Sequence, residues 1–358
     1  MKFLILSNTI SNAGDYLFLK GGMQVIKQFL GLENSTYINI HEQKILPEAI
    51  VEYDFAIYVG GPLYTNRLLE NEFYNIVMQL KKYNIKLYLL GCGWYGANDL
   101  KSTVNNYHFS DKSRKVLDYI SQNGLLGCRD YLSDYILKIN GYNNCIVTGC
   151  PAWYLDLNQS TDSKEEIKKV VISDIGLTKS SNLYFEKKQQ FDMVLDYVKN
   201  RFYNCEIIVT FNNGIETRYS TEFNKEIEKE LIARGIKYFD LSYRSEGFYT
   251  YDDCDLHVGF RVHSHIYCLT KGIPSILICE DARGLGMNAT LGLSALSANI
   301  STEEKQFLPN NYLERELAFE VDKMLENRAF EMVRIKQLFK YFYKKQLTDF
   351  FSTIISKN

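Results

Sequence analysis

Short apolar runs alternate with longer segments of helical periodicity along the first half of the chain. Each run reads as a strand buried on both faces, as in a parallel sheet covered by helices. The expected strands span residues 3–7, 37–40, 54–59, 86–90, 125–128 and 145–148. Apolar spacing predicts helices over 16–30, with Gly21 and Gly22 as an interruption, and over 110–122. This alternation predicts a doubly wound parallel sheet.

The alternation starts again after residues 155–168, a polar stretch without periodicity that we interpret as a domain linker. The second set of expected strands spans 170–173, 207–211, 238–241, 256–258 and 275–279, and the expected helices span 189–202, 222–234 and 263–271. From residue 303 the pattern is helical. We therefore predict an α/β protein with two doubly wound Rossmann-like domains, 1–155 and 168–300, that face a cleft. Helices in 301–358 are expected to brace the two domains.

Composition agrees with a folded globular protein of two domains. A chain of 358 residues exceeds what one ordinary core supports, and 46% of the residues are hydrophobic. The net charge of -2 lacks the excess of positive charge that is typical of nucleic-acid-binding proteins. The N-terminal apolar run is too short for a signal peptide, and we expect no transmembrane segment. We expect the protein in the cytoplasm, either free or peripherally bound at the inner face of the membrane.

Cysteines and histidines indicate neither a disulfide framework nor a metal centre. The eight cysteines form no C-x-x-C pair and mostly adjoin apolar runs, as buried free thiols in a reducing compartment do. His257, His263 and His265 fall close together, but His257 should lie in a strand and point elsewhere. No carboxylate is spaced with them as a ligand. We expect no metal and no cofactor, and interpret His265 as a hydrogen-bonded helix residue.

Polar residues and glycines follow several of the expected strands. Carboxyl ends of parallel strands meet at the crevice where open α/β sheets bind ligands. After the first strand, Gly14 permits a tight turn and Asp15 can cap the next helix, within the sequence Asn12-Ala13-Gly14-Asp15. N–H groups at that helix start can hold an anion or sugar oxygens, although a plain capped turn fits equally well.

Two glycine-rich turns follow the third and fourth strands. They are Gly60-Gly61-Pro62 and Gly91-Cys92-Gly93. A residue without a side chain lets the backbone approach a ligand closely. Ordinary turn chemistry at a strand end explains either one equally well.

Two arginines and one histidine are the remaining candidate functional residues. Arg129 follows the fifth strand, and its planar fork suits a carboxylate or phosphate, although a surface ion pair is the alternative. Arg261 and His263 stand where the strand 256–258 gives way to a helix. A cation beside a group that titrates near neutral pH suits an anionic substrate that needs proton transfer.

Together these features resemble the polysaccharide pyruvyl transferase family over roughly residues 1–295. Four segments carry the resemblance, namely Asn12-Ala13-Gly14-Asp15, Gly60-Gly61, Arg129-Asp130-Tyr131-Leu132-Ser133, and Gly259-Phe260-Arg261-Val262-His263-Ser264 with Gly272-Ile273-Pro274. The resemblance implies a GT-B-like fold. It also implies transfer of a pyruvyl group from phosphoenolpyruvate to two hydroxyls of a sugar, which yields a cyclic ketal and phosphate. The acceptor would be a sugar or glycan, lipid-linked or nucleotide-linked.

The resemblance points to Arg129, Arg261 and His263 as the catalytic positions. His263 is expected to act either as the acid that protonates the donor or as the base that deprotonates the acceptor. The expected substrate-binding residues are Asn12, Gly14, Asp15, Gly60, Gly61, Gly93, Ser264, Asp281 and Arg283.

The chain departs from the family pattern at three places. Glu280-Asp281-Ala282-Arg283 stands where the family often has Tyr-Asp-x-Lys, Pro62 shortens the glycine-rich turn, and Gly149-Cys150-Pro151 lacks the usual Asp before Pro. Two alternatives therefore stay open. One is a sugar-nucleotide-dependent glycosyltransferase of GT-B-like fold, in which Glu280 would bind the nucleotide. The other is a non-catalytic glycan-binding member of the family.

Overall fold

The computed structural model divides the chain into two compact units. It describes residues 1–44, 46, 48–96, 104–157, 166–176, 184–217, 222–301 and 307–358. The first unit comprises Met1–Ile10, Phe18–Leu155 and Phe339–Asn358, and the second comprises Ser11–Leu17 and Asp156–Leu338. Most of the expected linker, residues 158–165, lies outside the described residues. By its contacts, the turn after the first strand belongs to the second unit.

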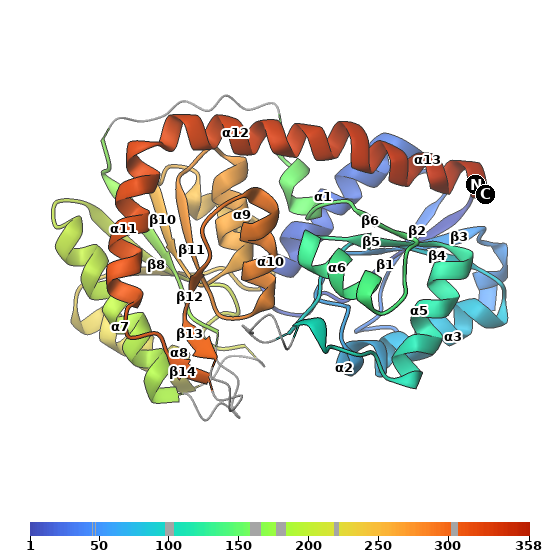
Figure 1. The fold of residues 1–358 in the computed structure, drawn as a ribbon, viewed down its shortest axis with the longest axis horizontal. Coiled ribbons are helices and arrows are strands. Elements are labelled where there is room, and N and C mark those ends of the chain that lie inside the picture. The colour runs from blue at the N-terminus through green and yellow to red at the C-terminus, as the bar shows by residue number, and fades with distance from the viewer. Residues whose placement is uncertain are drawn as a thin grey trace. The chain divides into compact units, whose positions relative to one another are not determined.

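The first unit contains a parallel sheet of six strands in the order β2-β1-β3-β4-β5-β6 (Figure 1). The strands are β1 (Phe3–Ser7), β2 (Ser35–Asn39), β3 (Phe55–Val59), β4 (Lys86–Cys92), β5 (Leu125–Cys128) and β6 (Cys145–Val147). Every residue of β1, β3 and β5 is buried, as in strands covered on both faces. Because the ladders are parallel, the residues that follow β3, β4 and β5 lie at one edge of the sheet.

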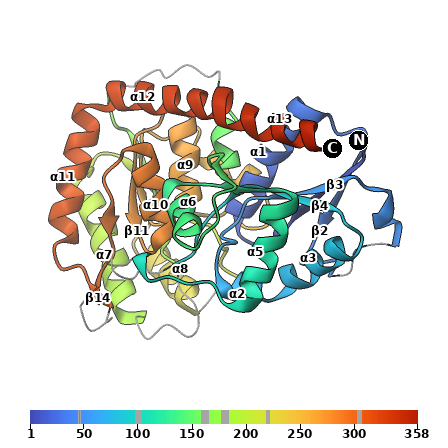
Figure 2. The ribbon, with the colours of Figure 1, turned by 45° about the vertical axis from the view of Figure 1, so that its right-hand side comes forward.

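Helices alternate with these strands. They are α1 (Ala13–Leu30), α2 (Asn66–Leu69), α3 (Glu72–Lys82), α5 (Asp111–Asn123) and α6 (Tyr131–Ile139), with 3-10 turns η1 (Glu48–Glu52) and η2 (Pro151–Tyr154). Figure 2 shows α3 and α5, which pack against each other and against β4. The interruption expected at Gly21 is wrong, because α1 runs through it. A Cβ at Gly21 would lie 2.2 Å from the Pro151 carbonyl oxygen, so this glycine permits close packing on η2.

The second unit contains another parallel sheet of six strands, in the order β12-β11-β10-β7-β8-β9. The strands are β7 (Lys169–Ser173), β8 (Glu206–Phe211), β9 (Lys237–Asp240), β10 (Leu256–Gly259), β11 (Ser275–Cys279) and β12 (Leu296–Ser297). A small antiparallel pair, β13 (Asn299–Ser301) and β14 (Phe307–Pro309), follows. β12, β13 and β14 were not expected, because two or three residues are too few to show a hydrophobic period.

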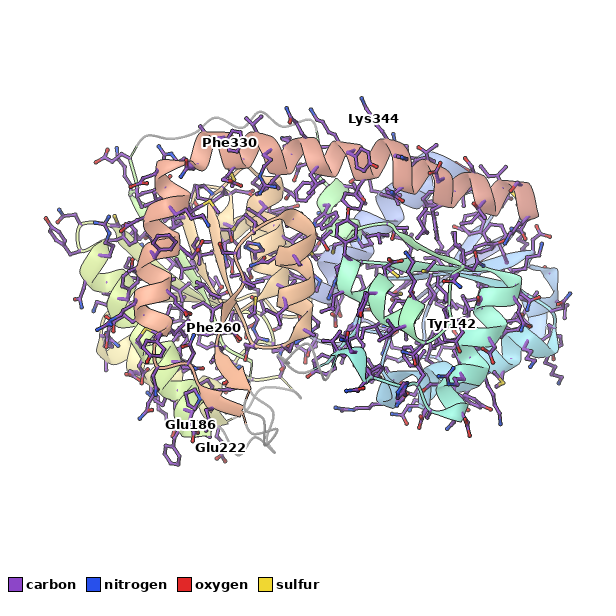
Figure 3. The ribbon with its side chains drawn as sticks, viewed as in Figure 1. Tyr142, Glu186, Glu222, Phe260, Phe330 and Lys344 are labelled. Carbon is purple, nitrogen blue, oxygen red and sulfur yellow. The ribbon has the colours of Figure 1, made fainter. Side chains whose placement is uncertain are left out.

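Helices of the second unit lie on both faces of its sheet (Figure 1). They are α7 (Tyr184–Arg201), α8 (Glu222–Ala233), α9 (Val262–Thr270), α10 (Ala282–Leu291) and α11 (Leu313–Glu326), with a 3-10 turn η3 (Glu246–Tyr251). The helices α9, α10 and α11 all contact β11. Phe260, at the end of β10, is buried inside this unit (Figure 3). The strand β10, which precedes Arg261, therefore lies in the hydrophobic core of the second unit.

The helical pattern predicted from residue 303 onward is wrong at β14, which is a strand, and the chain is helical from α11 on. The C-terminal part after α11 is helical. It consists of α12 (Arg328–Tyr341), the π-helical turn η4 (Phe342–Leu347) and α13 (Thr348–Lys357). The residues up to Leu338 belong to the second unit, and those from Phe339 onward belong to the first. In the first unit, Phe339 stacks on Trp153 at 5.0 Å between ring centroids. None of the described helices is long and apolar enough to cross a lipid bilayer.

Candidate functional site

The turn after β1 is capped by a residue other than the one expected. Asn12 Oδ1 accepts the N–H of Gly14 at 2.8 Å, so the Asn12 side chain satisfies an N–H group that the start of α1 leaves open. Asp15 lies inside the first turn of α1 and is not its cap. The prediction that Asp15 caps this helix is therefore wrong, because the helix begins two residues earlier than Asp15.

Residues that follow β8 hold this turn in the second unit. Asn12 Nδ2 donates to Asn213 Oδ1 at 2.6 Å, and the Ala13 N–H donates to the Asn212 carbonyl at 2.9 Å. A side-chain bond and a backbone bond together fix both the position and the orientation of the turn. The start of α1 is therefore held in the second unit by these two hydrogen bonds.

His263 packs directly against this turn. It is the second residue of α9, and a Cβ at Gly14 would lie 2.1 Å from its Nδ1. Gly14 has no positive φ, so its role is not the tight turn that the sequence suggested. The missing side chain instead makes room for the imidazole. The structure thus brings together Gly14 and His263, two of the predicted site residues.

Arg261 forms a bidentate ion pair with a residue that the sequence analysis missed. Its Nε donates to Asp174 Oδ1 at 2.7 Å and its Nη2 donates to Asp174 Oδ2 at 2.6 Å. Burial lowers the pKa of Arg261, but Asp174 more than offsets this effect and the pKa is raised overall. Among the described residues, these bonds engage Nε and Nη2. Nη2 also donates to the Ile175 carbonyl at 3.3 Å, and a ligand-binding role for Arg261 stays a prediction.

Ser264 belongs to a buried hydrogen-bond network that supports this region. Its Oγ donates to Asn212 Oδ1 at 3.2 Å and lies 2.9 Å from the Tyr251 hydroxyl, which in turn lies 2.6 Å from Thr210 Oγ1. The Asn212 N–H donates to Asp174 at 3.1 Å. Asn212 therefore connects the turn after β1, the Arg261 counter-ion and α9.

The acidic residues that follow β11 form hydrogen bonds and ion pairs within the second unit. Asp281 caps α10 by accepting the Arg283 N–H at 2.9 Å, and its carboxylate pairs with the Arg283 side chain. Glu280 pairs with Lys187 at 2.8 Å and accepts the Gly176 N–H at 2.8 Å. These carboxylates thus have structural partners, and a substrate-binding role for Asp281 and Arg283 stays a prediction.

Asp15 is a carboxyl group that can exchange a proton near neutral pH. Burial raises its pKa to about 7, and the positive charge of Arg283 partly opposes this shift. A pKa close to the working pH is what general acid–base catalysis requires. Asp15 meets this requirement, and a catalytic role for Asp15 or His263 stays a prediction.

Arg129 lies in the first unit, at the carboxyl end of β5, and is 2% exposed. Its Nε contacts Asp130 at 3.3 Å, while Asp130 mainly caps α6 by accepting the Ser133 N–H at 2.8 Å. Arg129 Nη2 is buried and has no hydrogen-bond partner among the described residues. A Cβ at Gly93 would lie 2.7 Å from this Nη2, so Gly93 makes room for the guanidinium.

The other predicted glycines adopt conformations that favour glycine. Gly60 has φ of 68° and Gly61 has φ of 85°, in the left-handed region where a Cβ is unfavourable. Backbone geometry therefore accounts for both residues at the end of β3. Contact of this turn with a ligand stays a prediction.

Sequence reasoning missed two partners of the predicted site residues, and both follow strands. Asp174 comes directly after β7, and Asn212 comes directly after β8. Their position at the carboxyl end of a strand was a usable signal. The described residues contain no group of three or more His, Cys, Asp or Glu side chains that could hold a metal ion.

Comparison with known proteins identifies one family. A family model described as polysaccharide pyruvyl transferase matches residues 12–279. This match confirms the resemblance that the four sequence segments indicated. A search of curated protein sequences gives no match.

Solved structures show the fold. UDP-GlcNAc 2-epimerase from Neisseria meningitidis aligns with a TM-score of 0.56 at 9% identity, over 97% of this chain and 100% of that chain. The corresponding enzyme from Methanocaldococcus jannaschii aligns with a TM-score of 0.53 at 10% identity, over 91% and 93%. A trehalose-phosphate synthase from Burkholderia vietnamiensis aligns with a TM-score of 0.52 at 12% identity, over 99% and 98%. These neighbours confirm the predicted GT-B-like α/β class.

Proposed function

Because the chain belongs to the polysaccharide pyruvyl transferase family, we propose that it transfers a pyruvyl group from phosphoenolpyruvate to two hydroxyls of a sugar. The product is a cyclic ketal, and inorganic phosphate leaves. The acceptor is a sugar within a polysaccharide or its precursor. Arg129, Arg261 and His263 are the proposed catalytic residues.

Arg129 is the observation that carries this proposal. A guanidinium that is 2% exposed and has an Nη2 without a partner among the described residues is costly to keep in a folded protein. An anionic ligand would supply the missing acceptors, and Arg binds carboxylate and phosphate groups through paired N–H donors. Phosphoenolpyruvate carries both of these groups.

The proposed reaction needs protons at defined atoms. A proton adds to the methylene carbon of phosphoenolpyruvate, and C2 becomes an oxocarbenium-like centre that one sugar hydroxyl attacks. The C2–O bond to phosphate then breaks, and the second hydroxyl attacks C2. Each hydroxyl loses a proton. One of these balances the proton taken up at the methylene carbon, and the other is taken up by the departing phosphate. His263 and Asp15 are the proposed groups for these transfers, and positioned acid–base groups contribute about 10²–10⁴-fold.

Product analysis tests the reaction class. We expect incubation with phosphoenolpyruvate and a panel of lipid-linked or nucleotide-linked sugars to release phosphate and to add the mass of a pyruvate ketal to one acceptor. Release of a nucleoside diphosphate from a sugar nucleotide, without use of phosphoenolpyruvate, would instead support a glycosyltransferase. Binding of phosphoenolpyruvate or glycan without any turnover would support a non-catalytic member of the family.

Replacing Arg129 by Lys is expected to weaken phosphoenolpyruvate binding by roughly 10- to 100-fold. Lys keeps the positive charge but loses the paired donors, and a hydrogen bond to a charged group contributes about 1.5–3 kcal/mol. Calorimetric titration of phosphoenolpyruvate measures the change. The matched control is Arg234→Lys, because Arg234 pairs with Asp196 on the surface of the second unit. Equal donor affinity in Arg129→Lys and the wild type would remove Arg129 from the donor site.

A further inference from the structure

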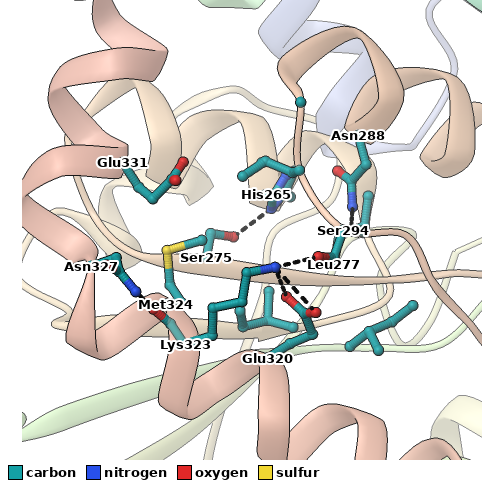
Figure 4. Close-up of a pocket in the computed structure, with 14 residues that line it drawn as sticks. His265, Ser275, Leu277, Asn288, Ser294, Glu320, Lys323, Met324, Asn327 and Glu331 are labelled. Carbon is teal, nitrogen blue, oxygen red and sulfur yellow. Dashed lines mark hydrogen bonds and ion pairs between the residues drawn. The ribbon is translucent and has the colours of Figure 1, made fainter.

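A separate cavity lies at the amino end of β11, whereas Arg261 follows the carboxyl end of β10. It has a volume of about 90 Å³ and is lined by α9, β11, α10, α11 and the start of α12 (Figure 4). A cavity needs only about 10–15 Å³ of such volume to hold one water molecule. This one is therefore large enough for a small organic molecule.

A chain of hydrogen bonds connects the cavity wall to the Arg261 segment. The Arg261 N–H donates to Ser173 Oγ at 3.1 Å, and Ser173 Oγ lies 2.9 Å from His257 Nε2. His257 Nδ1 lies 2.7 Å from Ser275 Oγ, and Ser275 Oγ lies 2.7 Å from His265 Nδ1. Every link of this chain joins adjacent strands or a strand and its covering helix.

The direction of the protons follows from the first link. Because Ser173 Oγ accepts the Arg261 N–H, its hydroxyl hydrogen is available to His257 Nε2. His257 then donates from Nδ1 to Ser275, and the Ser275 hydroxyl donates to His265 Nδ1. His265 is left with its proton on Nε2. Burial lowers the pKa of His257 well below its usual value and that of His265 to about 3, so both rings are neutral.

Two buried polar atoms at the cavity have no hydrogen-bond partner among the described residues. They are His265 Nε2, on a residue that is 1% exposed, and Asn288 Oδ1, on a residue that is 2% exposed. The Asn288 amide orientation is set, because its Nδ2 donates to the Ser294 carbonyl at 2.7 Å. One atom is a donor and the other an acceptor. Asn288 lies close enough to His265 to oppose, as a hydrogen-bonding neighbour, the lowering of the imidazole pKa by burial, but His265 Nε2 and Asn288 Oδ1 do not have the geometry of a direct hydrogen bond.

We propose that this cavity binds a small neutral molecule bearing hydroxyl groups, one of which accepts from His265 Nε2–H and donates to Asn288 Oδ1. A hydroxyl is the group that does both at once. The assignment is independent of the pyruvyl transfer proposed above. Through Ser275, His257 and Ser173, the bound hydroxyl joins the hydrogen-bond chain that ends at the Arg261 backbone.

Charge at the cavity wall selects against ions. Glu320 and Glu331 line the cavity, and their charges are balanced by Lys323 and Arg334 respectively. A neutral imidazole supplies no charge for an anion. A divalent cation would need several ligating side chains, and the described residues contain no such group of three. Glycerol is therefore a suitable probe, and inorganic phosphate is a suitable contrast.

Ring ¹⁵N spectra of the full chain, labelled at its five histidines, test the proposal. We expect glycerol to change the His265 ring shifts in a saturable manner, with a smaller parallel change at His257. Inorganic phosphate should leave both rings unchanged. A His265→Gln sample identifies the His265 signals. No saturable change with glycerol would overturn the proposal and leave a cavity that takes up water only.

Asn288→Leu removes the acceptor while keeping the approximate size of the side chain. We expect its half-saturating glycerol concentration to rise at least about tenfold, because a buried donor on the ligand is then left unsatisfied. Asn200→Leu, at an exposed position on α7, is the matched control and should titrate as the wild type does. Equal titrations of wild type and Asn288→Leu would contradict the proposal. If Asn288→Leu does not fold, the contrast between glycerol and phosphate on the wild type still decides.

Discussion

Replacing His263 by Gln is expected to lower kcat of the proposed pyruvyl transfer by about 10²–10⁴-fold, with little change in KM for phosphoenolpyruvate. Gln keeps a polar side chain of similar reach but cannot gain or lose a proton near neutral pH. The effect should therefore fall on the chemical step rather than on donor binding. Phosphate release under steady-state conditions, measured at saturating and at limiting donor, separates kcat from KM.

Two companion variants sharpen this result. Gly14→Ala places a Cβ 2.1 Å from His263 Nδ1, so the imidazole must move and kcat should fall in the same direction. His108→Gln, at an exposed position, is the matched control and should keep wild-type turnover. Wild-type kcat in His263→Gln would remove His263 from the mechanism and leave Asp15 as the proton-transfer group in the second unit.

Replacing Asp174 by Ala is expected to destabilise the second unit by about 3–5 kcal/mol. Asp174 is 0% exposed and accepts two hydrogen bonds from the Arg261 guanidinium. Its removal leaves the buried guanidinium without this counter-ion and also leaves the Asn212 N–H without its acceptor. Urea unfolding followed by circular dichroism measures the loss as a lower midpoint of the transition that reports the second unit.

A surface ion pair provides the control for this prediction. Asp322 pairs with Arg201 at 3.1 Å, and both side chains are about half exposed, at 53% and 52%. Asp322→Ala should therefore cost at most about 1 kcal/mol. Replacing both partners, as Asp174→Leu with Arg261→Met, should recover much of the lost stability, because no buried charge remains. A cost of Asp174→Ala equal to that of Asp322→Ala would show that the buried pair does not stabilise the fold.

Strand positions were predictable because hydrophobic patterning is local. The strand 3–7 and the strand 275–279 were placed with the bounds that the structure shows, since each is an apolar run between polar residues. The start of α1 was not, because the cap is set by whether Asn12 Oδ1 reaches the Gly14 N–H. Likewise, α10 and the short strands after it produce no period that a sequence pattern can reveal.

The sequence identified individual residues as site candidates, but it did not identify the residues that they contact. Arg261 and His263 stood out because a cation and an imidazole follow a strand. Their partners did not stand out, because Asp174 is 87 positions away from Arg261 in the sequence. The pair forms because β7 lies beside β10 in the sheet. Strand order depends on how helices cover the sheet, and local patterning does not encode it.

By itself, the sequence determined the α/β class, the alternation of strands and helices, and the motif residues that identify the family. All three are local features, because they depend on the polarity and identity of residues that lie close together in the sequence. Only the tertiary structure decided that Asp174 neutralises Arg261, that Gly14 accommodates the His263 ring, and that the turn after β1 belongs to the second unit. Such contacts join residues far apart in the chain, so they exist only once the sheets have formed.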